Sequence, residues 1–167
     1  TSSKPIWTLR CSNKLFVGYL EELGVSNNKS STVTIPEAIP PELIRHFIRG
    51  YFEGDGCVSI TSKSTLKFSL SSKSEKLIKS VAEVLFEQVG IGICGKRRSL
   101  SHVSSPNCPC LTVYKRSAKD SDLVMYVISS SSLEMLEKLY CYLYQNVDEA
   151  YRMNRKFNVF KKALGSL

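Results

Sequence analysis

The residue most suggestive of chemistry is Asp55, a single carboxylate that lies between Gly54 and Gly56 in the stretch FIRGYFEGDGCVSI. Before Asp55 the apolar residues recur at helical spacing, and after Gly56 apolar and polar residues alternate as in a β-strand. Two explanations fit an acid at such a junction. Asp55 is either part of a helix C-cap, or it is held at a defined point for chemistry.

A second group of potential metal ligands comes later in the chain. Cys94, His102, Cys108 and Cys110 supply the kinds of ligand that a structural zinc site uses. The Cys-Pro-Cys spacing, however, is shorter than the usual gap between paired zinc ligands. We therefore favour free thiols in a long loop over a zinc site. The chain contains no Ser-His-Asp order, no glycine-rich phosphate loop and no Cys-x-x-Cys pair, which argues against the enzyme classes built on them.

Hydrophobic periodicity predicts the elements that must position Asp55. In chain order we expect a helix over 41–55, a hairpin with its turn at 62–64, a helix over 72–88, strands at 91–96, 111–116 and 123–128, a helix from 131, and a basic helix over 148–164. Capping-box patterns at Ser72-x-x-Glu75 and Ser131-x-x-Glu134 open two of these helices. Strands that follow one another between helices indicate an α+β fold with an antiparallel sheet.

The first 40 residues have a different character. The stretch PIWTLR reads as a short strand, and a helix capped by Ser12 should follow it over 12–23. A polar segment and the proline-rich stretch IPEAIPP then form a connector, because proline removes backbone donors. We therefore divide the chain into an N-terminal strand, helix and linker, residues 1–40, and a main domain, residues 41–167.

The composition narrows the class of partner. The chain of 167 residues carries 23 Lys and Arg against 15 Asp and Glu, for a net charge of +8. Such an excess fits either a nucleic-acid partner, whose phosphates basic side chains neutralise, or a merely soluble basic protein. No apolar run reaches the length of a membrane span, and Cys11, Cys57 and Cys141 lie among apolar neighbours. We expect a reduced, intracellular protein with no membrane partner.

The stretch around Asp55 also supports a family resemblance. Residues 48–56, Ile-Arg-Gly-Tyr-Phe-Glu-Gly-Asp-Gly, resemble the nine-residue signature of LAGLIDADG homing endonucleases, and the resemblance extends over roughly 24–164. It implies an αββαββα half-domain with a saddle-shaped antiparallel sheet that binds DNA, here preceded by the strand-helix-linker extension. Residues 41–167 would then be the endonuclease domain.

The resemblance implies roles for residues of the motif. Asp55 would be the catalytic carboxylate and a ligand of Mg²⁺, with the backbone carbonyl of Gly54 as a second ligand. The motif helices of two half-domains would pack together at Gly50, and we expect Phe47, Tyr51 and Gly54 in the same interface. One Asp55 is only half of such a site. The other half must come from a second copy of the chain, in a homodimer, or from a half-domain missing from this sequence.

The resemblance also implies which residues contact DNA. The polar face of the hairpin and its exit would lie in the major groove, and basic residues further along would contact phosphate. The expected contacts are Ser59, Thr61, Lys63, Lys67, Ser69, Ser71, Lys73, Lys96, Arg97, Arg98, Lys115 and Arg116. By itself, such a face is more often the solvated side of an amphipathic sheet, and only its position after the motif favours DNA contact.

Two further family features are less clear in this chain. Lys156 is the candidate for the basic residue that stabilises charge on the phosphate. The glutamine that many members carry after the second strand has no counterpart here, because residues 71–73 are Ser-Ser-Lys. Glu53 is expected to cap or pair rather than to bind metal.

The sequence therefore predicts a Mg²⁺-dependent, site-specific nuclease that cuts double-stranded DNA, encoded within an intron or intein. One alternative is a non-cleaving binder of the same fold, such as an RNA maturase, an intron splicing factor or a DNA-binding regulator. Another is the C-terminal half of a two-motif enzyme. Splicing by the chain itself is not expected, since it lacks a nucleophile at its start and the usual His-Asn at its end.

Overall fold

The computed structural model describes residues 10, 12–25, 29–94, 110–117 and 124–165. In chain order the elements are α1 (Lys14–Glu22), α2 (Ile44–Asp55), β1 (Cys57–Ile60), β2 (Leu66–Ser72), α3 (Glu75–Val89), β3 (Gly92–Cys94), β4 (Cys110–Ser117), β5 (Val124–Ser130), α4 (Leu133–Tyr144) and α5 (Asn154–Leu164). A 3₁₀ turn precedes α2 at Pro41–Leu43, and another precedes α5 at Glu149–Tyr151. None of the helices in the described residues is long and apolar enough to cross a membrane.

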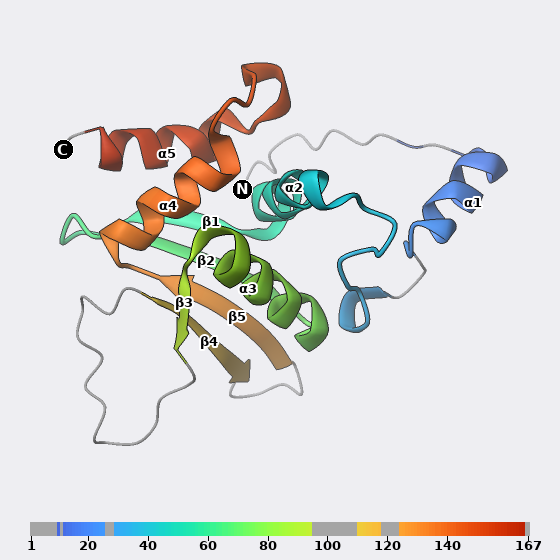
Figure 1. Cartoon of the computed structure of the whole chain (residues 1–167), viewed down its shortest axis with the longest axis horizontal. Helices are drawn as coiled ribbons and strands as arrows, with labels where there is room; N and C mark the ends of the chain where they lie inside the picture. Colours follow the sequence, from blue (N-terminus) through green and yellow to red (C-terminus); the bar gives the residue numbers. More distant parts are fainter. Residues whose placement is uncertain (1–9, 11, 26–28, 95–109, 118–123, 166–167) are drawn as a thin grey trace, which may run out of the picture.

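The described strands form one sheet in the order β1-β2-β5-β4-β3 (Figure 1). The pairs β1–β2, β2–β5 and β4–β5 are antiparallel, so the fold is α+β as predicted. The short edge strand β3 differs, because it runs parallel to β4. Parallel neighbours need a connection of about a dozen residues or more, and the segment 95–109 supplies that length.

The helices α2, α3, α4 and α5 lie on one face of the sheet (Figure 1). Their core centres on Phe52 of α2, whose ring centroid lies 5.0 Å from that of Phe68 on β2 and 6.0 Å from that of Phe160 on α5. All three rings are buried, and burial of each such side chain stabilises the fold by roughly 1.5–3 kcal/mol. The residue three before Asp55 is thereby fixed in the centre of the core.

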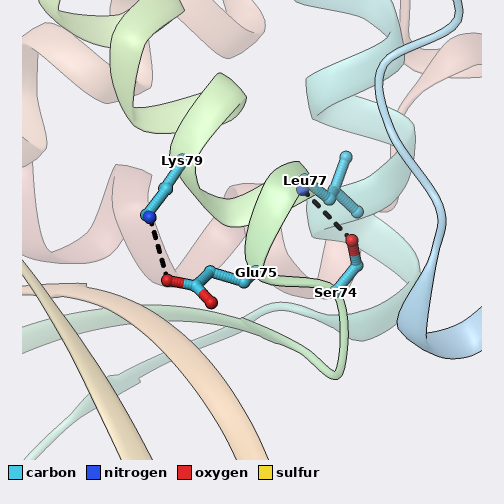
Figure 2. A network of polar contacts seen from close by, with 4 residues as sticks. All are labelled: Ser74, Glu75, Leu77 and Lys79. Atoms are coloured by element: carbon cyan, nitrogen blue, oxygen red, sulfur yellow. Dashed lines mark hydrogen bonds and ion pairs between the residues drawn. The ribbon is translucent and has the colours of Figure 1, made fainter.

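The start of α3 shows how the hairpin is joined to the next helix. The sequence predicted Ser72 as the cap, but the hydroxyl of Ser74 accepts the hydrogen bond from the Leu77 amide, at 3.2 Å (Figure 2). Ser72 instead accepts from the Ser74 amide at the end of β2. Ser74 is fully buried and also donates to the Val33 carbonyl, at 2.5 Å. It therefore ties the linker, the hairpin and α3 together.

Glu75 begins α3 and pairs with Lys79 one turn later, at 2.9 Å (Figure 2). Both side chains are about half exposed or more, so the ion pair contributes little to stability. A smaller shift, of one residue, applies to α4, where Ser132 rather than the predicted Ser131 is the N-cap residue.

The helix α1 lies away from the sheet, at the end of the linker (Figure 1). It is capped by Asn13, whose side chain accepts from the Phe16 amide, rather than by Ser12 as predicted. No residue of α1 is buried, and Leu15 is 76% exposed. Residues 5–9 of the strand predicted for PIWTLR lie outside the described residues, and the division of the chain at residue 40 stays a prediction.

Candidate functional site

The helix α2 ends at Asp55 because the chain turns away at Gly56. A Cβ atom at position 56 would lie 2.6 Å from the Phe52 carbonyl oxygen and would also collide with the Phe52 ring. Only glycine lets the backbone pass this buried ring and enter β1 directly. Gly56 donates its amide to the Phe52 carbonyl, at 2.8 Å, which closes the helix. The carboxylate of Asp55 is left exposed at the point where helix and strand meet.

The charged residues at the C-terminal end of α2 are acidic, although this end of a helix favours basic residues. Glu53 and Asp55 are both in the last turn of α2, where the helix dipole favours cations, and no basic residue lies in that turn. The cation comes from α5 instead. The Lys156 ammonium donates to the Phe52 carbonyl, at 2.6 Å, and to the Gly56 carbonyl.

Lys156, predicted as a catalytic residue, therefore contacts backbone within its own chain. Its side chain is only 3% exposed, which leaves it behind the helix end rather than on the surface beside Asp55. Burial lowers the pKa of Lys156 and the charge of Arg155 acts in the same direction, whereas Cys57, Glu53 and Asp55 raise it. The two acids of the motif, Glu53 and Asp55, therefore lie close enough to the buried ammonium of Lys156 to raise its pKa.

One face of α2 is open. Gly50 and Gly54 are exposed, and a Cβ atom added at either position would meet no atom within 4 Å. Leu43, on the same side, is 48% exposed, and Phe47 is half-buried. Tyr51 differs from the other predicted interface residues, since its hydroxyl donates to the Ser71 carbonyl, at 2.9 Å, and links α2 to β2.

Arg49, in the middle of α2, links this helix to α4. This buried residue contacts the Nδ1 atom of His46, at 2.7 Å, and donates to the Leu143 carbonyl at the end of α4, at 3.5 Å. His46 accepts this hydrogen bond only when it is neutral at Nδ1. Burial lowers the pKa of His46, and the charges of Arg49 and Arg45 act in the same direction.

The oxygen atoms at the end of α2 are suitable for a hard cation. Asp55 provides an exposed carboxylate, and Gly54 lies in the last turn, where carbonyl groups have no partner within the helix. Mg²⁺ is usually bound by one or two carboxylates together with waters and substrate phosphates, so these groups fit part of such a site. Within the described residues, no group of three His, Cys, Asp or Glu side chains could complete it.

Two of the four proposed zinc ligands, His102 and Cys108, lie outside the described residues. Cys94 and Cys110 are on the neighbouring strands β3 and β4. They are two register positions apart, since Cys94 pairs with Thr112 and Cys110 pairs with Gly92.

The face of the sheet opposite the helices carries the polar hairpin positions. Ser59 pairs with Lys67 in the β1–β2 register, and both are exposed. Ser69 and Ser71 follow on the same face of β2 and are partly exposed. Strand alternation in the sequence was sufficient to assign these four residues.

A row of small residues crosses this face from strand to strand. Ser69 pairs with Cys57 on β1 and with Ser129 on β5, which in turn pairs with Thr112 on β4. Ser129 was not among the predicted contacts. Its alternation with Ile128 along β5 is the signal that would have found it.

The remaining predicted contacts lie at the ends of the hairpin. Lys63 is exposed at its tip, and Lys73 is exposed where β2 leaves the sheet. The hydroxyl of Thr61 accepts from the Thr65 amide, at 3.2 Å, within a turn that also contains Ser64 at φ 57°. Thr61 therefore helps to form the turn rather than continuing the strand.

The two basic residues predicted on β4 occupy opposite faces. Arg116 pairs with Met125, a position on the polar face, whereas Lys115 pairs with Tyr126. A hydrogen bond to Glu75 of α3 raises the pKa of Tyr126. The Tyr126 side chain therefore lies on the face of the sheet that the helices cover. In this register, position 116 falls with the polar face and position 115 with the side of the helices. Lys96, Arg97 and Arg98 lie outside the described residues.

Comparison with known proteins gives one match. Residues 42–120, just under half of the chain, match the family model of a LAGLIDADG-like domain. The matched segment runs from α2 through β4, and β5, α4 and α5 follow it. No curated protein and no solved structure matches the chain significantly. The resemblance read from the signature at 48–56 is thus confirmed.

Proposed function

Because the chain carries a LAGLIDADG-like domain, we propose that it is a Mg²⁺-dependent endonuclease that cuts double-stranded DNA at a specific site and works as a homodimer. The domain itself is typical of homing endonucleases and maturases. The finer assignment rests on the site at the end of α2.

One observation carries the proposal, which is the exposed carboxylate of Asp55 at the junction of α2 and β1. An acid there is unfavourable for the helix, because it lies at the negative end of the dipole. Local rules are commonly broken at functional sites, where another requirement outweighs stability. The junction leads straight into the edge strand of the polar face, so the acid and the proposed DNA surface are adjacent.

The chain's own groups divide the work. The Asp55 carboxylate and the Gly54 carbonyl would hold Mg²⁺ beside the scissile phosphate. When bound, such an ion supplies an activated water and stabilises the leaving oxygen of a phosphodiester. Lys67 and the serines of the polar face would contact base edges, and the net charge of +8 favours association with the phosphate backbone.

The open face of α2 supports pairing of two half-domains. A glycine inside a helix costs about 1 kcal/mol relative to alanine, and Gly50 and Gly54 have no neighbour that requires it. A second helix packed closely against this face would explain both glycines and would bring two Asp55 carboxylates together. In a longer two-motif protein, a preceding half-domain would take the same place.

A second candidate is a nucleic-acid binder of the same fold that does not cut. The glutamine that many family members carry after the second strand is absent from residues 71–73, where Ser72 is buried and accepts a hydrogen bond from the Ser74 amide. Lys156 is likewise occupied by backbone carbonyls. These two observations favour a binder, whereas the exposed Asp55 favours a nuclease, since a pure binder has no need of an acid facing phosphates.

A selection from randomised DNA separates the two candidates. The purified chain is incubated with a plasmid library that carries a randomised insert, in Mg²⁺ and separately in EDTA, and linear products are sequenced. A nuclease yields linear plasmids with a common sequence at the break only in Mg²⁺. Plasmids that are retained by the protein but stay circular in Mg²⁺ would support the binder instead.

A further inference from the structure

Two polar contacts cross between the end of α2 and the start of α5. The Lys156 ammonium, in the first turn of α5, donates to the Phe52 and Gly56 carbonyls. In return, the Glu53 carboxylate of α2 accepts the Met153 amide just before α5, at 2.7 Å. Each helix end thus receives from the other helix the charge that its dipole favours. We call these two contacts the α2–α5 clamp.

The clamp encloses Asp55. Phe52 lies three residues before it and Gly56 one residue after it, so the ammonium of Lys156 holds the backbone on both sides of the acid. Lys156 also lies 4.9 Å from the centroid of the Phe52 ring, within range of a cation–π interaction. The lysine is therefore anchored to the most buried part of the motif helix.

Glu53 is held by its surroundings as well. Burial raises the pKa of Tyr144 on α4, and the charge of Glu53 raises it further. The Glu53 carboxylate is therefore near the Tyr144 hydroxyl. The Tyr144 side chain is 4% exposed. Glu53 is thus close to both α4 and the start of α5.

We propose that Lys156 and Glu53 are positioning residues, which fix the end of α2 so that the Asp55 carboxylate meets metal and phosphate in one geometry. This inference rests on the proposed nuclease function. Lys156 does not touch the phosphate in this role, because it is buried and both of its hydrogen bonds go to carbonyls. Its neighbour Arg155, in contrast, is exposed.

Amide hydrogen exchange of the metal-free, full-length chain tests the clamp without DNA. Loss of a hydrogen bond should speed exchange by about tenfold where that bond protects the amide. We expect this increase at Met153 in Glu53→Ala, because the Glu53 carboxylate is the acceptor of that amide. In Lys156→Met the Gly56 amide keeps its own acceptor, the Phe52 carbonyl, but the helix end loses the ammonium that holds it, so we expect Gly56 to exchange faster through more frequent opening of the last turn. Glu53→Gln, which keeps an acceptor oxygen, should preserve protection at Met153. The exposed Lys161→Met is the matched control and should leave both amides unchanged.

Cleavage of the plasmid library at varied Mg²⁺ concentration then tests positioning. Loss of a nearby positive charge would, on electrostatics alone, lower the Mg²⁺ concentration that gives half-maximal cleavage. Loss of positioning should raise it, by about tenfold for a misplaced ligand. We expect the increase in Lys156→Met and Glu53→Ala, but not in Lys161→Met.

Three results would overturn the inference. Unchanged exchange at Gly56 in folded Lys156→Met would contradict the α2–α5 clamp. An unchanged or lower Mg²⁺ requirement for cleavage by Lys156→Met would contradict the positioning role. A wild-type chain that cuts no DNA would overturn the nuclease proposal and positioning with it, even if exchange changes as expected. Should Lys156→Met fail to fold, Glu53→Ala applies the exchange test at a half-buried side chain. The Mg²⁺ test is then the comparison of Glu53→Ala with Glu53→Gln, because both lose the charge and only glutamine keeps the acceptor oxygen.

Discussion

Replacement of Gly50 by alanine should change stability and assembly in opposite directions. Gly50 lies inside α2, and a Cβ atom there would meet nothing within 4 Å in the same chain. Alanine should therefore stabilise the isolated chain by about 1 kcal/mol through helix propensity alone. If two α2 helices pack through this face, the same methyl group would keep their backbones apart and weaken the dimer.

Two assays measure the two effects. Urea unfolding, at a concentration where the wild-type chain is monomeric, gives the free energy of unfolding of the single chain, because dimerisation would otherwise add to it. Sedimentation equilibrium gives the dimer dissociation constant. Gly18→Ala is the matched control for assembly, since Gly18 also lies in a helix, α1, with nothing within 4 Å of an added Cβ.

The combination of results decides the outcome. We expect Gly50→Ala to be the more stable monomer and the weaker dimer, while Gly18→Ala dimerises like the wild type. A Gly50→Ala chain that gains stability and dimerises as before would refute the glycine face as the interface. A loss of monomer stability would instead refute the open environment of Gly50.

Two further predictions concern the ends of α2. Gly56→Ala should destabilise the chain by about 1–3 kcal/mol, because its Cβ would overlap the buried Phe52, and a midpoint of urea unfolding at the wild-type value would contradict this. The lowered pKa of His46 means that the unfolded chain binds a proton there at higher pH than the folded chain. Stability should therefore fall as pH drops below the unfolded value of 6.5, and His46→Gln should reduce this fall. Equal pH dependence of the two proteins would refute the effect.

Local patterns in the sequence were enough to predict the parts of the site that one element forms. The change of period at Gly56 gave the end of α2 and the start of β1, and alternation assigned Lys67 and Ser69 to the polar face. Such features depend only on neighbours along the chain. The close approach of Gly56 to Phe52 explains why that junction carries a glycine.

Contacts between distant elements could not be predicted in this way. Lys156 was expected at a phosphate, but packing of α5 beside β1 buries it against the end of α2, and no pattern near residue 156 reveals that partner. The parallel pairing of β3 depends on how distant strands meet, and the register of β4 against β5 decides which of positions 115 and 116 shares a face with Ser129. Register between strands separated by long connections is set by the whole fold.

The most direct measurement compares the wild-type chain with Asp55→Asn on the DNA site recovered by the selection. Asparagine keeps the shape of the side chain and removes its charge from the unfavourable end of the helix, so stability should change by no more than about 1 kcal/mol. We predict that the wild-type chain linearises the plasmid in Mg²⁺, whereas Asp55→Asn binds the same DNA with similar affinity and leaves it intact. Cleavage by Asp55→Asn at the wild-type rate would contradict the assignment of Asp55 as the catalytic carboxylate.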